Sequence, residues 1–278
     1  MANKQRIAKK TAMERLLSEG FFETKEAAVP YVMSGAVFCG TEKVLTAGQR
    51  IPLHLPLTVR GLSDRYVGKG GYKLEGAIRD FGVSAQGRVC IDAGACTGGF
   101  TDCLLQHGAE KVYAVEVGFG QLAGSLQQNP RVVNLEKTNL GDSSLLSLDP
   151  LPTLGSVDLS YLSLVKAVPQ FYAVMHGVGE LLCLVKPLFE TDNAEARRSG
   201  ELDPAEYAPL LTQLIRQLSV QENTTVCGVA PSSVTGNHGT HEFFLHVKFG
   251  EGIPAKADWE SEIAEAVAKV LLLPRYEK

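Results

Sequence analysis

The sequence predicts an α/β protein with a doubly wound parallel sheet, helices on both of its faces, and a small α+β unit at the front of the chain. Seven strand-like segments recur between residues 88 and 249, and helical patterns separate the earlier ones. The last two strands are joined by SSVTGNHGTH without a helix, so we expect a hairpin whose final strand is antiparallel. Residues 51–71, rich in proline and glycine, separate this pattern from the front of the chain and predict a linker.

The front of the chain predicts two helices and a hairpin. Apolar residues recur at helical spacing over residues 10–22, and ETKEAAVPYVMSG indicates a second helix that Thr24 would cap and Gly35 would end. Alternating apolar residues in AVFCG and KVLTAGQRI indicate two or three short strands. We therefore assign a small domain to residues 1–58, a linker to 59–71, the main domain to 72–250 and a helical tail to 251–278.

The strands of the main domain are predicted from short apolar runs with turn residues at their ends. In chain order they are RVCIDAG, KVYAVEVG, RVVNLEK, GSVDLSY, ELLCLVKP, TTVCGVAP and EFFLHVKF. Helices are expected over FTDCLLQHG, QLAGSLQQ, LVKAVPQFYAVM and YAPLLTQLIRQLSV. The segment ADWESEIAEAVAKVLL predicts a terminal amphipathic helix.

Composition excludes several classes of protein. The chain has 278 residues, of which 45% are hydrophobic, enough for a sizeable core. No apolar run approaches the roughly 18 residues of a membrane span, and the start lacks the features of a signal peptide, so we expect a cytoplasmic protein that binds no membrane. The six cysteines form no CxxC pair, and we expect no metal site. Residues 1–80 contain 13 Lys and Arg against 8 Asp and Glu, which suits either a polyanion partner or an ordinary solvated surface.

Residues 90–103, CIDAGACTGGFTDC, pass from a strand through a glycine-rich loop into a helix. Ligands of open α/β sheets bind at the carboxyl ends of the strands. The dinucleotide pattern G-x-G-x-x-G is not met, because Cys96 stands where the second glycine would let the backbone approach a pyrophosphate. The spacing from Asp92 through Gly94 to Gly98 suits S-adenosylmethionine, a nucleoside ligand without phosphates. The alternative is a tight turn that binds no cofactor.

Residues at the next two strand ends would complete a nucleoside site. Glu116 ends the strand KVYAVEV, where a carboxylate can accept hydrogen bonds from both ribose hydroxyls. Thr138 and Asn139 follow the third strand, where they could bracket the adenine.

Four ionisable residues lie at the ends of predicted elements. Lys73 opens a helix after GKGG, Asp158 ends GSVD, Lys186 ends ELLCLVK, and Glu242 begins the last strand. A lysine buried before a proline in an apolar strand is costly unless it is used. Each residue alone would be interpreted as part of a surface salt bridge, but the four together predict a reactive centre.

This group of two lysines and two carboxylates suits methyl transfer to a ribose 2′-hydroxyl. A hydroxyl is a poor nucleophile until it loses its proton, and a lysine beside a second ammonium can accept or orient that proton. Other targets fit less well. The chain has no NPPY-like or DPPY-like segment for a base amine and no Pro-Cys pair for attack on a cytosine ring.

Several motifs together resemble the TlyA family, the haemolysin-A-like ribosomal RNA 2′-O-methyltransferases, whose catalytic domain is similar to that of FtsJ-type enzymes. The resemblance covers about residues 10–249 and includes GKGGYKLEGAI, CIDAGACTGGFTDCLLQHGA, VYAVEVGFGQLAGSL, RVVNLEKTN, VDLSYLSL, LVKPLFE and PSSVTGNHGTHEFFLH. It implies a Rossmann-like class I S-adenosylmethionine methyltransferase sheet that acts on cytidine in ribosomal RNA or a ribosomal subunit. It also implies a catalytic tetrad of Lys73, Asp158, Lys186 and Glu242, a cofactor loop of Asp92, Gly94, Ala95, Cys96, Thr97, Gly98 and Gly99, and Glu116 as the ribose-binding acid.

The chain departs from this family at defined positions. Cys96 replaces a serine and Glu116 an aspartate of the usual pattern. The front unit resembles the family's alpha-L RNA-binding domain, but KKTAMERLL and FCGTEKV replace that domain's Arg-Leu-Asp and Val-Asn-Gly. Our candidates for contact with RNA phosphates are Lys9, Lys10, Lys25 and Arg50.

Two other functions are open to such a sequence. One is an RNA-binding or ribosome-assembly factor that is catalytically weak or inactive, against which the complete tetrad argues. The other is a membrane-lytic protein, which only the haemolysin name suggests and which the acidic polar side of the terminal helix disfavours. The sequence is compatible with a monomer and with a homodimer.

Overall fold

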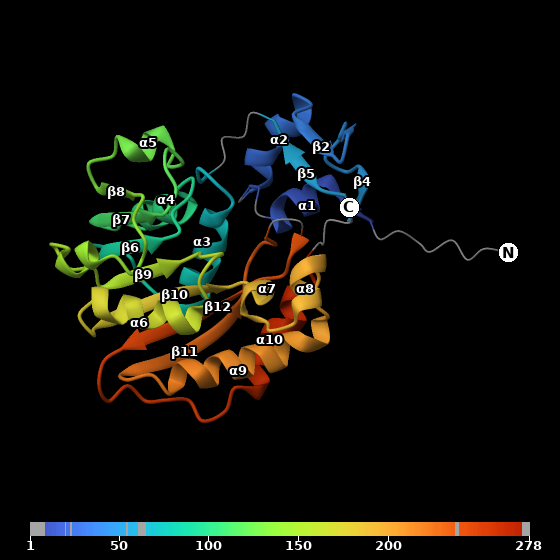
Figure 1. Cartoon of the computed structure of the whole chain (residues 1–278). Helices are drawn as coiled ribbons and strands as arrows, with labels where there is room; N and C mark the ends of the chain where they lie inside the picture. Colours follow the sequence, from blue (N-terminus) through green and yellow to red (C-terminus); the bar gives the residue numbers. More distant parts are fainter. Residues whose placement is uncertain are drawn as a thin grey trace. The chain divides into compact units, whose positions relative to one another are not determined.

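The computed structural model describes residues 9–19, 21–22, 24–53, 55–60, 65–236 and 239–273. Internal contacts divide the chain between Arg65 and Tyr66 into two compact units, which Figure 1 draws from blue at the N-terminus to red at the C-terminus. The division falls inside the segment that the sequence predicts as a linker.

Two capped helices form the first half of the first unit. Helix α1 spans Ala12–Ser18, and α2 spans Lys25–Met33. The Thr11 hydroxyl accepts a hydrogen bond from the backbone N–H of Glu14, whose carboxylate accepts one from the Thr11 N–H. Thr24 caps α2 at Ala27 as predicted. These side chains satisfy N–H groups that have no partner inside their helices, which fixes where each helix begins.

Short strands complete the first unit. Strand β1 (Lys9–Thr11) pairs antiparallel with β4 (Arg50–Pro52), while β2 (Val37–Cys39) lies between β3 (Glu42–Lys43) and β5 (Leu57–Val59). The linker prediction is therefore wrong for residues 51–52 and 57–59. Only three residues of β5 pair, and its alternation of buried and exposed residues is too short to be distinguished from a proline-rich loop by pattern.

A seven-stranded sheet forms the centre of the second unit. Its order is β11-β12-β10-β9-β6-β7-β8, in which β12 is antiparallel to both neighbours and β10, β9, β6, β7 and β8 are parallel. This confirms the predicted sheet and its antiparallel last strand. The strands are β6 (Val89–Ala93), β7 (Lys111–Glu116), β8 (Val132–Glu136), β9 (Leu154–Val157), β10 (Gly179–Val185), β11 (Thr224–Pro231) and β12 (Phe243–Phe249).

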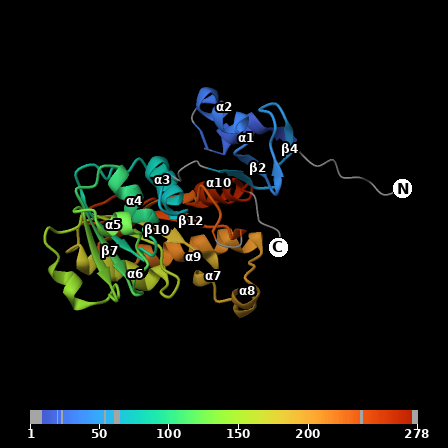
Figure 2. The ribbon, with the colours of Figure 1, turned by 90° about the horizontal axis from the view of Figure 1, so that it is seen from above.

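Helices cover both faces of this sheet, and two hydrophobic clusters result. Successive strand residues point to opposite faces, so Cys90 packs with α3 and α4 while Ile91 packs with α6 and α9. Figure 2 shows these two pairs of helices on either side of the strands. The helices are α3 (Gly70–Phe81), α4 (Gly99–Gln106), α5 (Gly124–Gln127), α6 (Leu164–Val174), α7 (Pro187–Glu190), α8 (Ala194–Ser199), α9 (Tyr207–Ser219) and α10 (Glu260–Val270), with short 3₁₀ turns at Ser143–Ser147 and Pro204–Glu206.

The terminal helix α10 is part of this unit. It packs against β11 and α9, and Ile263, Ala266 and Val270 are buried in the larger cluster. Burying an isoleucine or valine side chain stabilises a fold by about 1.5–3 kcal/mol. Residues 260–270, which the sequence predicts as a tail, therefore contribute to the core. Within the described part of the chain, no helix combines the length and apolar character that crossing a membrane requires.

A charged network joins β10 to its surroundings at the beginning of the strand. Glu180 accepts a hydrogen bond of 2.7 Å from Nε2 of His246 on β12 and pairs with the guanidinium of Arg88. The His246 ring also stacks on Phe81 of α3, with 5.4 Å between centroids. The hydrogen bond from His246, assisted by Arg88, lowers the pKa of Glu180 to about 2. The ionised carboxylate is thus favoured in the folded chain.

This network predicts a pH-dependent contribution to stability. The pKa of Glu180 is about 2 in the folded chain against an ordinary 4.5, so its contribution is complete above about pH 4.5 and is lost as the pH falls toward 2. We expect Glu180→Gln to lower the Tm at pH 7, by about 2–4 °C for each kcal/mol by which the free energy of unfolding falls. At pH 3 we expect a much smaller decrease in Tm. Thermal denaturation followed by circular dichroism between pH 3 and 7 measures this, with the exposed Glu110→Gln as control. Equal losses at both pH values would contradict the assigned pairing.

Candidate active site

The glycine loop lies between β6 and α4, at the carboxyl edge of the parallel strands. Gly94 has a φ of +85°, and a Cβ placed there would lie 2.2 Å from the backbone oxygen of Asp158. A side chain would separate the two segments, so glycine is required at this position. The loop is thereby held against the residue that follows β9. The other loop residues are Ala95, Gly98 and Gly99, which are buried, and Cys96 and Thr97, which are exposed.

Asp92 lies beneath the loop and is fully buried. Its Oδ2 accepts a hydrogen bond of 2.7 Å from Thr101 Oγ1 on α4, and its Oδ1 accepts one of 2.9 Å from Ser156 Oγ on β9. Burial raises the pKa of Asp92 to about 6, against the effect of these hydrogen bonds. The sequence predicts that Asp92 contacts a cofactor. Its hydrogen bonds to α4 and β9 support the loop, and its contact with a cofactor stays a prediction.

Glu116 lies at the end of β7, beside the loop. Its Oε2 accepts a hydrogen bond of 3.0 Å from the backbone N–H of Cys96, and its Oε1 accepts one of 2.8 Å from that of Gly118. The residue is half-buried. The backbone N–H of Thr138 donates a hydrogen bond of 3.0 Å to the backbone carbonyl of Glu116. Asn139 is exposed, and its Oδ1 accepts a hydrogen bond of 3.0 Å from the backbone N–H of Gly141 in the same turn.

Helix α3 brings Lys73 to this edge because its glycine-rich start packs on the loop. A Cβ on Gly99 would lie 3.0 Å from the backbone nitrogen of Gly71, so a side chain there would push the start of α3 away from the loop. Lys73, two residues further on, is 7% exposed, and its Nζ lies 2.6 Å from Oε2 of Glu242. An ammonium this deeply buried needs a paired carboxylate.

Lys186 and Asp158 form a second ion pair, between the ends of β10 and β9. Their side chains are 18% and 22% exposed, against 9% and 5% for the buried pair. Because β12 is antiparallel and Val185 pairs with Phe243, the residues one step beyond, Lys186 and Glu242, end at the same edge. The four residues of the predicted tetrad are therefore brought together from four elements.

The electrostatics of Glu242 link the two pairs. Burial raises the pKa of Glu242, and the Lys73 ammonium opposes this rise. The charge on Asp158 raises the same pKa further, while that on Lys186 lowers it. Unit charges influence one another in this way only when they are near neighbours in a poorly solvated site. The arrangement can hold two ammonium groups in fixed positions beside an exposed edge of the sheet.

Three hydroxyl side chains at the site were not selected from the sequence. Ser160 Oγ lies 2.9 Å from Lys186 Nζ, and Thr101 and Ser156 hold Asp92. Ser160 lies inside the motif VDLSYLSL, but a serine two residues after an acid has no signature of its own. Only the structure shows which of these hydroxyls reaches a charged partner.

The candidate RNA contacts are in the first unit. Lys9, Lys10 and Arg50 are exposed on the β1–β4 ribbon, where Thr11 pairs with Arg50 and the Arg50 guanidinium donates a 3.0 Å hydrogen bond to the Lys9 carbonyl. Lys25 is the first residue of α2 and is also exposed. The ribbon thus gathers three of the four candidates.

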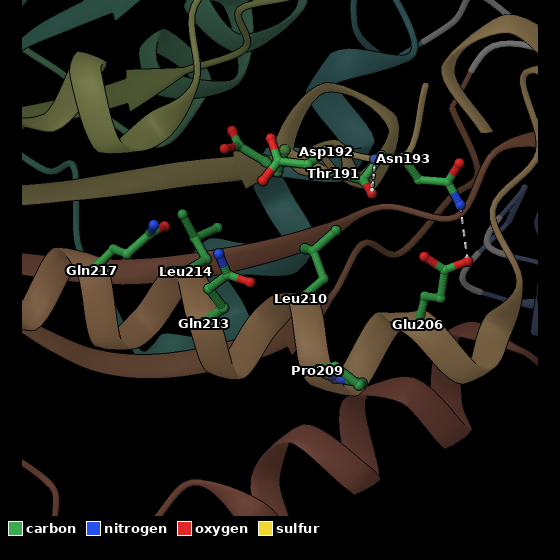
Figure 3. Close-up of a pocket in the computed structure, with 10 residues that line it drawn as sticks. Thr191, Asp192, Asn193, Glu206, Pro209, Leu210, Gln213, Leu214 and Gln217 are labelled. Carbon is green, nitrogen blue, oxygen red and sulfur yellow. Dashed lines mark hydrogen bonds between the residues drawn. The ribbon is translucent and has the colours of Figure 1, made fainter. Parts of the chain in front are cut away.

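A separate pocket of about 300 Å³ lies between α9 and the segment after α7 (Figure 3). None of its lining residues belongs to the glycine loop or to the tetrad. Asn193 and Glu206 face each other across it, with 3.4 Å between amide nitrogen and carboxylate. Glu190, also in its wall, accepts a hydrogen bond from the first N–H of α6. We assign this pocket no part in the site.

Comparison with known proteins identifies the family to which the chain belongs. A model of the family described as FtsJ-like methyltransferase matches residues 66–249. The chain belongs to the FtsJ-like methyltransferase family. It is 38% identical over 264 residues to "Putative rRNA methyltransferase YqxC" of Bacillus subtilis, covering 94% of each chain. It is 31% identical over 234 residues to "16S/23S rRNA (cytidine-2'-O)-methyltransferase TlyA" of Mycobacterium tuberculosis, covering 84% of this chain and 87% of that one.

A solved structure supports the same relationship. "Putative hemolysin from Streptococcus thermophilus" superposes with a TM-score of 0.70 at 32% identity, covering 96% of this chain and 97% of that one. The predicted resemblance to TlyA and hemolysin A is therefore confirmed. FtsJ-like methyltransferases use S-adenosylmethionine, and the residues here fit that ligand. Gly94 lets the loop lie against the backbone of Asp158, and Glu116 accepts a hydrogen bond from the loop backbone at Cys96.

The position of Asp92 generates a prediction. Its ionised carboxylate accepts hydrogen bonds from two hydroxyls, whereas below pH 6 the protonated group must donate one. We expect the affinity for S-adenosylmethionine to fall several-fold from pH 7.5 to pH 5.5 in the natural protein. In Asp92→Asn it should be weaker throughout and nearly independent of pH. Isothermal titration calorimetry across this range measures both, with thermal denaturation to verify folding. An unchanged pH dependence in Asp92→Asn would refute the role.

Proposed function

We propose that this protein transfers a methyl group from S-adenosylmethionine to the ribose 2′-hydroxyl of a cytidine in ribosomal RNA. The observation that carries the proposal is the meeting of the Lys73–Glu242 and Lys186–Asp158 pairs at the edge that holds the glycine loop. The names of the TlyA relatives from Mycobacterium tuberculosis and Campylobacter jejuni, both cytidine-2'-O-methyltransferases, support the choice of target.

The two ion pairs have different roles in this proposal. Lys186 is the more accessible lysine, so it contacts the ribose hydroxyl. As an ammonium it orients the hydroxyl oxygen, and as a neutral amine it accepts the hydroxyl proton. Lys73 and Glu242 are nearly inaccessible to solvent, and they act as a fixed ion pair that supports the site. S-adenosylmethionine, when bound by the Gly94 loop and Glu116, supplies a methyl group activated by its sulfonium charge.

Positioning supplies more of the rate than proton transfer in this arrangement. Alignment of reacting groups can lower a barrier by about 7–11 kcal/mol, whereas general-base help contributes about 10²- to 10⁴-fold. The side chains of the tetrad are held by partners that lie on α3, directly after β9 and directly before β12, and such rigidity is what alignment requires. We therefore expect small displacements of Lys186 to affect turnover strongly.

The same edge carries exposed aromatic rings. Of the described aromatic side chains, the most exposed are Phe119, Tyr161 and Phe189, at 71%, 49% and 46%. Phe119 and Tyr161 lie in the loops after β7 and β9, and Phe189 lies in the short helix α7 after β10, so all three follow the carboxyl ends of strands. The Lys137 ammonium lies 4.5 Å from the Phe119 ring centroid. Rings and cations in this combination suit unpaired nucleotides, whose bases stack while their phosphates meet the charges.

An RNA-binding or ribosome-assembly factor without turnover is the second candidate. The paired tetrad favours the enzyme, because a lysine kept buried with a carboxylate costs stability that an RNA-binding surface does not need. Titration with S-adenosylmethionine separates the two candidates. Absence of binding at millimolar cofactor would favour the assembly factor.

Replacing Lys186 tests the catalytic assignment. We expect Lys186→Ala to abolish methyl transfer to ribosomal RNA while its affinity for S-adenosylmethionine stays within a few fold. Transfer of tritiated methyl groups to ribosomal subunits from a strain that lacks the gene measures the first, and calorimetry the second. Lys166→Ala, an exposed lysine on α6, is the matched control and should retain full activity. Normal turnover by Lys186→Ala would remove this lysine from the mechanism.

Replacing the basic ribbon tests the RNA contacts. Each phosphate contact contributes about 0.7–0.9 to the slope of log K against log salt, so loss of three should reduce that slope by about 2–3. We expect the triple variant Lys9→Gln, Lys10→Gln, Arg50→Gln to bind ribosomal RNA more weakly with this flatter slope. Its affinity for S-adenosylmethionine should not change. Filter binding from 50 to 300 mM salt measures the slope, with the exposed Lys269→Gln on α10 as control. An unchanged slope would show that the ribbon does not contact RNA.

A further inference from the structure

Lys186 has an unusual set of neighbours for a lysine at a strand end. Its Nζ pairs with Oδ1 of Asp158 and donates a hydrogen bond of 2.9 Å to Ser160 Oγ. Both acceptors belong to one short loop after β9, the strand parallel to β10. On another side, the ring of Phe189 lies 5.8 Å from Nζ, within the range of a cation–π contact.

An ammonium has three N–H groups, so the number of its acceptors decides how well it is oriented. With Asp158 alone, the remaining N–H groups could rotate about the one ion pair. With Ser160 as a second acceptor, the direction of the third N–H is fixed. A free lysine side chain has about 2 kcal/mol of rotamer entropy, which two acceptors held by the same loop help to offset.

From this geometry we infer that Ser160 is a positioning residue, which holds the Lys186 amine so that its third N–H faces the ribose hydroxyl. The orientation toward a ribose hydroxyl rests on the proposed function. The contact between Ser160 and Lys186 does not. Ser160 is exposed, so core packing does not force its hydroxyl toward Lys186. The tetrad implied by the family does not include this serine.

The chemistry of a hydroxyl suits this place better than that of a second carboxylate. The Ser160 oxygen accepts a hydrogen bond from the charged ammonium, and it can equally accept one from the neutral amine, which keeps two N–H groups and leaves its lone pair to face the ribose hydroxyl. A second carboxylate would instead favour the charged form and oppose loss of the proton. Ser160 therefore holds Nζ in place in both protonation states, which matters if Lys186 gains or loses a proton during the reaction.

The experiment compares three full-length variants with the natural protein. Ser160→Ala removes the hydroxyl, Ser160→Thr keeps it, and Ser163→Ala is a control in the same loop, where the serine hydroxyl does not cap α6. The kinetic measurements are kcat, KM for ribosomal subunits, and kcat from pH 6 to 10. A correlation spectrum of lysine ammonium groups labelled with ¹⁵N reports on Lys186 directly, and Lys186→Ala assigns its signal.

We expect Ser160→Ala to lower kcat about 10-fold, a usual effect of one lost hydrogen bond to a charged group, with KM changed less than about 2-fold. Its pH profile should differ from that of the natural protein, and its Lys186 signal should broaden or disappear. Ser160→Thr and Ser163→Ala should retain kcat within about 2- to 3-fold, with a normal pH profile and signal.

Three results would overturn the inference. The first is an active Ser160→Ala with unchanged kcat, pH profile and Lys186 signal. The second is an increase in KM without a change in kcat, which would make Ser160 a contact to RNA. The third is an equal loss in Ser160→Thr, which would indicate a steric requirement. A natural protein without methyl transfer would refute the proposed function, and the Lys186 spectrum would still decide whether Ser160 positions the lysine.

Discussion

A buried charge requires an opposite charge beside it. In this fold the buried ammonium of Lys73 has the carboxylate of Glu242 as its partner. The pair joins the first turn of α3 to the residue before β12, segments about 170 positions apart in the chain. Breaking a buried pair by removing one partner costs about 3–5 kcal/mol in proteins generally. The arrangement around it is correspondingly constrained. The two residues meet because the glycine-rich start of α3 packs on the loop and because β12 is antiparallel to β10, which also brings Lys186 to the same edge.

Close backbone contact is the second constraint at this edge. Gly94 lets the loop approach Asp158, and Gly99 lets the start of α3 approach the loop. Beneath both contacts, Asp92 ties β6 to α4 and β9 through two hydroxyls. These contacts place a cofactor loop and a reactive pair on one rigid support. Such preorganisation is what an alignment-dominated reaction needs from its protein.

The two ion pairs divide the work of the site by their exposure. Lys73 and Glu242 are held in a dry environment, where their charges act on their neighbours with little screening. Lys186 and Asp158 lie nearer the surface, where a substrate can reach them, and Ser160 and Phe189 add contacts that the deeper pair does not have. The exposed rings of Phe119, Tyr161 and Phe189 follow the strands that end at this edge. One edge of the sheet thus combines a protected interior with an accessible rim.

The sequence by itself determined the strands and main helices of the second unit, the antiparallel last strand, and four ionisable residues at element ends. These follow from local patterns, because apolar periodicity and glycine spacing reflect short-range geometry. Strands β1 and β5 were not predicted, since three-residue strands carry too little periodicity. Only the tertiary structure decided which lysine pairs with which carboxylate, that Asp92 lies below the loop and that Ser160 reaches Lys186. Partners distant in sequence are chosen by packing and by the cost of unpaired buried charge, which no local pattern records.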